Sequence, residues 1–514
     1  MINLLGSPRR LCDGVSRREF LTLGSLGALG FGLSDHLAHA AERSGAGRGF
    51  GQAKACILIF LYGSPPQHET FDPKPDAVAE VRGEIGSIPS VVPGLRVCEL
   101  LPRTAQIMNE VTVVRSMTHR YPEHGVAYAV SGMPTYTPEL ETRPRDARHW
   151  PYIGSVVDYL AQRQSDSSRR SVSAMPRNIA LPWMLNSKTD ILVNAGPFAA
   201  FLGQAYDPLW TDFTGPGTQI VPHYTDSQTR DFHDPFGGTL PNGRFILSTE
   251  SRLRDDIPVE RLNVRQALLQ QFEQAQRRLG SEGSALSSPS GRGVGGEGIF
   301  DHHRQRAYSL LTSNAVHHAL DIAREPLALR ERYGMTLFGQ SCLAARRLVE
   351  AGTKFVTVFW DGYGQFGNCA WDTHNNHFPR LKEYLLPGFD LAYPTLIEDL
   401  RQRGLLDETL VLCLSEHGRT PQIDSRPRGA GRHHWSRVYS TVLAGGGIAR
   451  GRVVGSSDSQ GGDVRDTPIS PKDILATAFH LLGIDPHTLV PNAQGQPLPI
   501  AGDGELRSEL LSAS

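Results

Sequence analysis

The sequence lacks the features that mark three common classes of protein. Its 52 basic and 53 acidic residues almost cancel, so the basic excess typical of nucleic-acid-binding proteins is missing. Its six cysteines are scattered and none forms a CxxC pair, which argues against a disulfide framework. After the first 40 residues, no run is apolar enough to supply the roughly 20 residues that a membrane-spanning helix needs. With 39% hydrophobic residues, the chain is expected to fold around an apolar core.

The N-terminal 40 residues have the pattern of an export signal. Paired arginines stand in Ser16–Leu21, a glycine-rich apolar run covers Leu21–Leu33, and Ala38-His39-Ala40 is an A-x-A cleavage sequence. The apolar run is too short for a transmembrane anchor, so the pattern predicts a twin-arginine (Tat) signal peptide. Residues 1–40 should therefore be removed after transport by the Tat translocase, leaving residues 41–514 as one periplasmic or otherwise extracytoplasmic domain. Proteins that use this route fold before transport and often carry metals, which mildly favours a metalloprotein.

Short apolar runs in the mature chain predict strands that are buried on both faces, because their apolar residues are continuous rather than alternating. Helical patterns lie between several of these runs. Strands that alternate with helices predict an α/β fold in which helices cover both faces of a mostly parallel central sheet. The predicted strands are Ala55–Tyr62, Val111–Arg115, Lys354–Trp360, Thr409–Ser415 and Val438–Ala444, and the predicted helices include Leu343–Glu350, Tyr393–Arg403 and Pro471–Leu482.

Two stretches do not follow this alternation. Asp207–Leu247 is rich in proline, glycine and aromatic residues, which predicts an irregular excursion from the sheet that could act as a lid. Gly280–Gly298 is rich in glycine and serine and has no periodicity, so we expect a flexible surface insertion there. Helical patterns flank it, at Val264–Leu279 and His302–Arg324.

Histidine and carboxylate residues gather next to the predicted strands. In an open parallel sheet, the loops after the carboxyl ends of the strands form one crevice in which ligands bind. Four groups follow strands, and the fifth, which precedes its strand, can reach the same edge if its loop runs back over the sheet. In chain order the groups are Gly63–Asp72, Thr118-His119 with Glu123-His124, Asp361 with Trp371–His374, Glu416–Pro421, and Gly431–Trp435.

Imidazole and carboxylate together are the ligand set of zinc, manganese and iron. The convergence of five such groups therefore favours a divalent metal site, with zinc as the first choice and calcium, magnesium or manganese as alternatives. A polar, hydrogen-bonded cleft without metal is the competing interpretation.

These motifs bear a family resemblance. The order Glu-His-Gly and then His resembles the Asp-His-Gly and then His of alkaline phosphatases and sulfatases. More closely, the chain is identified as a member of the Tat-exported bacterial family called domain of unknown function 1501, colinear with it from Ile57 to Asp485. The matching motifs are Gly63–Pro75, Leu101–Ala105, Val114–His119, Arg330–Gly334, Ala345–Gly352, Trp371–His374, Gly404–Val411, Glu416–Pro421 and Gly431–Trp435.

The resemblance implies an alkaline phosphatase-like three-layer sandwich with two metals at the edge of its sheet. One metal would be held by Glu69 or Asp72 with Glu416 and His417. The other would be held by Asp372, His374 and His434, with Asp361 as a competitor of Asp372. Where this chain has Glu69, His417 and His433, the family usually has Asp, Phe and Asp. Glu69 reaches one methylene further than Asp, and His417 makes this chain resemble a true phosphatase or sulfatase.

The catalytic residues are less defined, because the Cys/Ser-x-Pro-x-Arg nucleophile motif of sulfatases is missing. Thr70, Thr118, Ser64 and Ser116 remain candidate nucleophiles, and His124 is a candidate phosphorylated nucleophile or acid. Arg419, with Arg115 or Arg432, could hold an anion through paired guanidinium bonds, although Arg419 could equally be a structural partner of Glu416.

Three functions remain open at this point. The first is a metal-dependent hydrolase of sulfate or phosphate esters, acting on a small molecule or a polysaccharide. The second is a non-catalytic exported binding or scaffold protein that retains the fold and one metal. The third, for which the sequence offers no specific signal, is a partner of an outer-membrane or cytochrome complex.

Overall fold

The computed structural model describes residues 47–121, 123–133, 137–168, 175–189, 195–224, 229–248, 314–364 and 370–512. Residues from Gly51 onward form one compact unit, to which the following description applies. The predicted signal peptide, the predicted insertion Gly280–Gly298 and the helical pattern Val264–Leu279 lie outside the described residues. Within them, no helix is long and apolar enough to cross a membrane.

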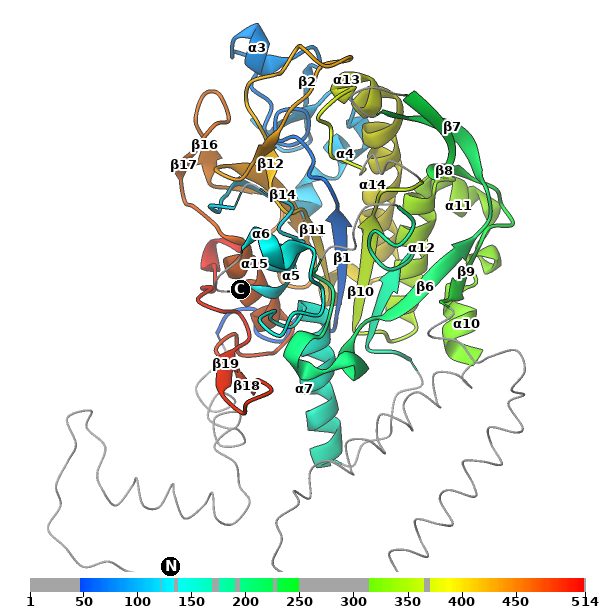
Figure 1. Cartoon of the computed structure of the whole chain (residues 1–514), viewed down its shortest axis with the longest axis vertical. Coiled ribbons are helices and arrows are strands. Elements are labelled where there is room, and N and C mark those ends of the chain that lie inside the picture. The colour runs from blue at the N-terminus through cyan, green and yellow to red at the C-terminus, as the bar shows by residue number, and fades with distance from the viewer. Residues whose placement is uncertain are drawn as a thin grey trace, which may run out of the picture. The chain divides into compact units, whose positions relative to one another are not determined.

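The core of the fold is a nine-stranded sheet in the order β15-β4-β14-β11-β1-β10-β5-β6-β9 (Figure 1). The central strands pair in parallel, as do β15 and β4, whereas β14 and the edge strand β9 are antiparallel to their neighbours. The predicted mostly parallel sheet is thus confirmed. Its strands are β1 (Ala55–Leu61), β4 (Val111–Met117), β5 (Asn178–Leu181), β6 (Leu209–Thr214), β9 (Arg244–Leu247), β10 (Phe355–Trp360), β11 (Thr409–Leu414), β14 (Tyr439–Ala444) and β15 (Arg452–Val454).

Helices cover both faces of the sheet, which confirms the predicted three layers. Alternate residues of β1 enter different apolar cores: Ile57 and Ile59 face one core, and Leu58 and Phe60 face the other. Figure 1 shows the two helical layers on either side of β1 and β10. The first core contains α12 (Leu337–Glu350) and α14 (Leu386–Gln402), and the second contains α5 (Val126–Ser131), α7 (Ile153–Ser168) and α15 (Pro471–Leu481).

Shorter elements surround these layers. They are α3 (Ala79–Arg82), α4 (Pro102–Gln106), α6 (Pro138–Glu141), α10 (Asn314–Leu320), α11 (Leu327–Tyr333), α13 (His377–Arg380), β2 (Ser87–Pro89), β3 (Arg96–Cys98), β7 (Gly217–Tyr224), β8 (Thr229–Thr239), β12 (Gly418–Arg419), β13 (His434–Trp435), β16 (Ser456–Ser457), β17 (Val464–Asp466), β18 (Leu489–Pro491) and β19 (Pro497–Pro499).

The prediction that Asp207–Leu247 is irregular was wrong. The segment contains four strands: β6 and β9 extend the central sheet, and β7 and β8 form a separate antiparallel pair. Its aromatic and aliphatic residues are the reason, because Phe245 and Leu247 on β9 are buried in the first core. The glycine and proline content therefore hid a strand pattern whose apolar side chains pack in the core.

Strand direction brings the predicted polar groups to one edge of the sheet. Because β14 is antiparallel to both β11 and β4, the strands β1, β4, β10 and β11 all point the same way. The end of β14 where the chain enters lies at their carboxyl ends. The loop that precedes β14 therefore starts at the same edge as the loops that follow the other four strands.

Candidate metal centre

Backbone hydrogen bonds fix the loops of this edge against one another. The Trp371 N–H donates to the Tyr62 carbonyl at 3.0 Å, which anchors the loop after β10 at the end of β1. The Arg432 N–H donates to the Thr373 carbonyl at 3.1 Å. A side chain at Gly431 would overlap the His374 carbonyl oxygen, so glycine permits this close approach. The two histidine-bearing loops are therefore held together by their backbones.

Three predicted ligands form a compact triangle of polar atoms. Nε2 of His374 lies 3.0 Å from Oδ1 of Asp372 and 3.0 Å from Nε2 of His434. Nε2 of His434 lies 3.2 Å from the same carboxylate oxygen. A tetrahedral zinc site with bonds of about 2.0–2.1 Å separates its ligand atoms by about 3.3 Å. The three atoms thus fit one face of such a site and leave the fourth position open.

A second group of histidines adjoins this triangle and shares His434 with it. One ligand atom from each of His124, His417 and His434 lies within 4.8 Å of the others. Nδ1 of His124 is 3.0 Å from Oε1 of Glu416, and its Nε2 is 3.3 Å from Oδ2 of Asp372. Among the described residues, Oε2 of Glu416 and Nε2 of His417 are buried and have no hydrogen-bond partner. Such atoms are suited to contact a cation.

The charges in the cluster divide its histidines into two kinds. Burial and the neighbouring His434 and Arg419 hold the pKa of His417 well below its usual range, and burial lowers the pKa of His434 to about 4. Although burial lowers the pKa of His124, Asp372 and Glu416 outweigh it and raise the pKa to about 10. Neutral His417 and His434 are ready to bind a metal, whereas His124 carries a proton at neutral pH in the metal-free protein.

The arginines expected to hold an anion are bound to the protein itself. The Arg419 guanidinium donates to Oδ1 of Asp372 at 2.5 Å and to the carbonyls of Gly63, Ser64, Trp371 and Arg432. Its carboxylate partner is thus Asp372 rather than Glu416. Arg432 donates to Glu69 and to the carbonyls of Val81, Thr420 and Pro421. Both side chains are fully buried, so they stabilise the loops of the centre.

Glu69 and Asp72, the acids expected from the loop after β1, have other partners. Glu69 pairs with Arg432 at 2.5 Å and with Nε2 of His377 at 3.4 Å. Asp72 lies 2.9 Å from the Lys74 ammonium and 3.4 Å from Nε of Arg115, and it accepts a hydrogen bond from the Ser457 hydroxyl.

The sequence suggested that His417 would face Glu69 or Asp72, whereas in the structure both acids pair with other residues. The His417 ring lies 4.3 Å from that of His434 and 5.6 Å from that of His124, centroid to centroid.

The candidate hydroxyls and the competing Asp361 are also accounted for. Thr70 donates to the Pro66 carbonyl at 2.7 Å, and Ser116 donates to the Thr467 carbonyl. The Ser64 hydroxyl accepts from the His417 N–H at 3.1 Å, but the residue is fully buried. Asp361 accepts hydrogen bonds from Trp183, Asn186 and Gly362, which engage both of its carboxylate oxygens.

Two residues beside the triangle escaped the sequence reasoning. Nδ1 of His433 lies 2.8 Å from Nδ1 of His374, and Nε2 of His433 lies 3.2 Å from Oδ2 of Asp424. The His433-His434 doublet was a visible signal, because two adjacent imidazoles stand in one loop. Asp424 carried no local signal, since its position depends on a backbone bridge with Gly431.

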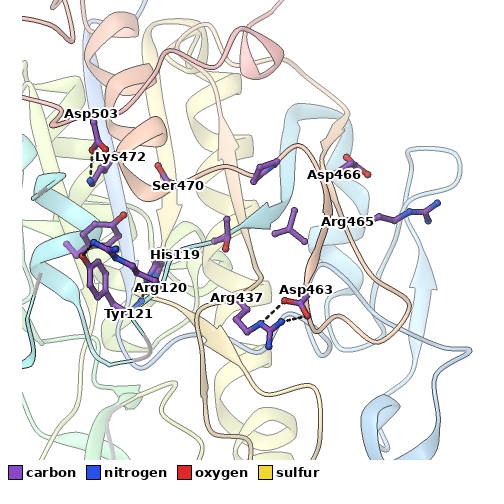
Figure 2. Close-up of a pocket in the computed structure, with 14 residues that line it drawn as sticks. His119, Arg120, Tyr121, Arg437, Asp463, Arg465, Asp466, Ser470, Lys472 and Asp503 are labelled. Atoms are coloured by element: carbon purple, nitrogen blue, oxygen red, sulfur yellow. Dashed lines mark hydrogen bonds and ion pairs between the residues drawn. The ribbon is translucent and has the colours of Figure 1, made fainter. Parts of the chain in front are cut away.

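A hollow of about 860 Å³ has Thr118 and His119 in its wall, but none of the candidate metal ligands lines it. Figure 2 shows two ion pairs in this wall, Lys472 with Asp503 and Arg437 with Asp463. Nε2 of His119 contacts the Glu416 carbonyl at 2.7 Å, so a single side chain stands between the hollow and the backbone of a cluster residue. The remaining lining residues are Arg120, Tyr121, Tyr128, Val464, Arg465, Asp466, Pro468 and Ser470.

Comparison with solved structures finds similar folds at low identity. The PsFucS1 sulfatase from Pseudoalteromonas sp. is 11% identical, with 88% of this chain and 72% of that chain covered and a TM-score of 0.34. The lipoteichoic acid synthase LtaP from Listeria monocytogenes is 10% identical, with coverages of 90% and 80% and a TM-score of 0.32. The phosphonate monoester hydrolase SpPMH from Silicibacter pomeroyi is 11% identical, with coverages of 90% and 77% and a TM-score of 0.31. Similarity at this level says nothing about activity.

Comparison by sequence identifies a family. No curated protein matches the chain significantly. One family model matches residues 53–511, which include every residue of the centre described above. The chain therefore belongs to the family described as "Protein of unknown function (DUF1501)".

Proposed function

We propose that the protein is an exported, metal-dependent hydrolase of phosphate or sulfate esters. The observation that carries the proposal is the triangle of Asp372, His374 and His434, whose ligand atoms are 3.0–3.2 Å apart. Three protein ligands with an open fourth position are typical of catalytic zinc sites, whereas structural sites are closed by four. A metal ion bound there would polarise an ester oxygen and neutralise the negative charge that develops on it.

A second metal next to Glu416 and His417 is compatible with their two unpartnered buried atoms. The loop after β1 contributes neither of its acids to this position, since Glu69 pairs with Arg432, and Asp72 with Lys74 and Arg115. His124 instead contacts Glu416 from the loop after β4. We therefore assign the stronger metal position to the triangle.

His124 is placed to handle the proton of the reaction. Its Nδ1 is held by the buried Glu416 carboxylate at 3.0 Å, which fixes the ring so that Nε2 points towards Asp372. A carboxylate that orients an imidazole in this way is a general device for acid–base catalysis. We assign to His124 the donation of a proton to the leaving alcohol.

The attacking group is then water rather than a side chain. Thr70 is bonded to a backbone carbonyl within its own turn, Thr118 lines the neighbouring hollow, and Ser64 is fully buried. The cluster itself is open to solvent, because the side chains of His374 and His434 are 38% and 20% exposed. Water and an ester can therefore reach the triangle.

A substrate that extends from the triangle past His119 would place its non-reacting part in the hollow behind that side chain. Its wall combines two tyrosines with several charged side chains, a composition that binds hydroxyl-rich molecules better than apolar ones. This favours an ester of a sugar or polysaccharide over an ester of a lipid.

A non-catalytic metal-binding protein is the second candidate, and one observation favours it. The guanidinium groups of Arg419 and Arg432 are bonded to carboxylates and carbonyls of the protein. They therefore do not present the forked donors with which a phosphatase or sulfatase would bind its anion.

Metal analysis of the purified full-length protein, followed by assays on phosphate and sulfate esters, separates the two candidates. The hydrolase predicts bound zinc or manganese and turnover of at least one ester class, both reduced in His374→Ala. An exposed histidine outside the centre, His487, provides the matched control, because His487→Ala should retain both. Metal binding without turnover on any ester would establish the binding protein instead.

A further inference from the structure

Beyond the ligands themselves, the centre has an outer chain of polar contacts that leads to solvent. His374 contacts His433 through the two Nδ1 atoms at 2.8 Å, and Nε2 of His433 contacts Oδ2 of Asp424 at 3.2 Å. The backbones of Asp424 and Gly431 exchange two hydrogen bonds of 2.8 Å, which fix the acid beside the histidine loop. The Thr420 N–H and hydroxyl bond the backbone of His433 in the same way. Backbone hydrogen bonds therefore hold the residues of this outer chain of contacts in place.

The ionisation of Asp424 determines which atom donates and which accepts in each hydrogen bond of this outer chain. Asp424 receives two bonds from the Arg426 guanidinium, at 2.9 and 2.7 Å, so it is an ionised acceptor. Nε2 of His433 must then donate to it, which leaves the lone pair of a neutral His433 on Nδ1. That lone pair accepts from Nδ1 of His374. The lone pair of a neutral His374 is consequently on Nε2, the atom in the triangle.

The opposite direction produces a conflict. If Nε2 of His374 carried the hydrogen and donated to Asp372, Nδ1 of His374 would accept from Nδ1 of His433. The lone pair on Nε2 of His433 would then face the Asp424 carboxylate at 3.2 Å, with acceptor against acceptor. Only the first direction satisfies every contact of the outer chain.

The favoured direction has a consequence for the triangle. It puts the Nε2 lone pair of His374 into the triangle, 3.0 Å from Oδ1 of Asp372 and 3.0 Å from Nε2 of His434, which can donate to it only as an N–H. The His374 lone pair and Oδ1 of Asp372 are then two acceptors 3.0 Å apart, an arrangement that a cation bound by both would stabilise. The outer chain thus prepares the triangle for a metal ion before the ion arrives.

We propose that His433 and Asp424 are positioning residues that hold His374 in the metal-binding tautomer. The inference rests on the metal site of the proposed function but not on its catalytic activity. Outer partners of this kind fix the ring and raise its basicity, and their loss typically weakens metal binding 10- to 100-fold. His433 is itself 48% exposed, so it is not part of the apolar core and its replacement should leave the fold intact.

The test compares variants of His433 by their affinity for zinc, measured on the full-length protein in competition with a chelating dye. His433→Ala removes the acceptor for His374. His433→Asn puts an amide oxygen at the place of Nδ1, since both atoms are one bond from Cγ, and so restores the acceptor. Asp424→Ala removes the far end of the chain. His487→Ala is the matched control, and thermal unfolding of the metal-free variants monitors the fold.

We expect His433→Ala to weaken zinc binding 10- to 100-fold, which corresponds to about 1.4–2.8 kcal/mol, and His433→Asn to recover most of it. Asp424→Ala should weaken binding less, and the double alanine variant should be no weaker than His433→Ala, because one chain is broken in both. Unchanged affinity in His433→Ala overturns the inference, as does an asparagine variant that binds no better than alanine.

The experiments distinguish a failure of the outer chain of contacts from a failure of the hydrolase proposal. Zinc binding that depends on His433, without hydrolysis of any ester, keeps the outer chain and removes the hydrolase. Ester hydrolysis together with a zinc affinity that does not change in His433→Ala keeps the hydrolase and removes the outer chain. A full-length protein that binds no zinc or manganese removes both.

Discussion

Glu69 offers a sharp test of which acids belong to the metal centre. Its carboxylate is fully buried and pairs with the Arg432 guanidinium at 2.5 Å, with His377 on its other side. Although burial raises the pKa of Glu69, Arg432 and His377 outweigh it and hold the pKa at about 2. The side chain is therefore a charged structural partner, and Glu69→Gln should act on stability rather than on metal content.

The expected magnitude follows from the burial of both partners. Removing one member of a buried ion pair leaves the other charge without compensation and costs about 3–5 kcal/mol. The amide oxygen introduced by Glu69→Gln would still accept one hydrogen bond from Arg432, so the lower end, about 3 kcal/mol, is expected.

Urea unfolding and metal analysis of the same preparations decide the matter. Glu69→Gln should unfold at clearly lower urea than the wild type and bind the same amount of metal at low temperature. The exposed Glu331 supplies a control, since Glu331→Gln should change neither quantity. If Glu69→Gln instead lost metal while keeping its stability, Glu69 would be a ligand and the assignment of the centre would be wrong.

Three further predictions concern the ligands, the pH dependence of stability and export. His374→Ala should bind metal at least tenfold more weakly with little change in metal-free unfolding, because this side chain is partly exposed; loss of the fold would contradict its role as a ligand. Burial and Arg432 lower the pKa of His68 to about 4. The unfolded side chain binds its proton near pH 6.5, so His68 does not change the free energy of unfolding above pH 6.5. Between pH 6.5 and pH 4 the free energy of unfolding should fall by about 3 kcal/mol. His68→Gln should flatten that slope in urea titrations, and an unchanged slope would assign it to other groups. Arg17→Lys with Arg18→Lys should leave the protein uncleaved in the cytoplasm, whereas normal processing after Ala40 would refute the Tat signal.

Strand runs and polar clusters could be read from the sequence because each depends on local pattern. A run such as that of β1 is buried on both faces, and its continuous apolar character records this directly. Asp372, His374 and His434 lie together because strand direction brings their loops to one edge. In a parallel sheet, residues that follow different strands in the sequence therefore meet at one edge, so a local pattern predicts the site.

The loop after β1 could not be read in the same way. Its acids Glu69 and Asp72 stand at the right place in the sequence for metal ligands, but in the structure they pair with residues from distant segments. Arg432 lies 363 residues from Glu69, and Ser457 lies 385 residues from Asp72. Neither pairing has a local signal, and each is decided by how long loops pack once the sheet has formed.

The choice between Asp361 and Asp372 shows the same principle within a single loop. Asp361 directly follows β10, which made it the competitor of Asp372 in the sequence analysis. The structure surrounds its two oxygens with N–H donors from Trp183, Asn186 and Gly362, and burial, partly offset by these donors, raises its pKa to about 7. A carboxyl group whose acceptor sites are filled by the protein has none left for a metal ion. Asp372 has positive and neutral nitrogen partners instead, from Arg419 and the histidines, so its oxygens face groups that a cation can replace or join. Ligand capacity thus depends on which groups surround a carboxylate, and proximity to the strand end is only the first condition.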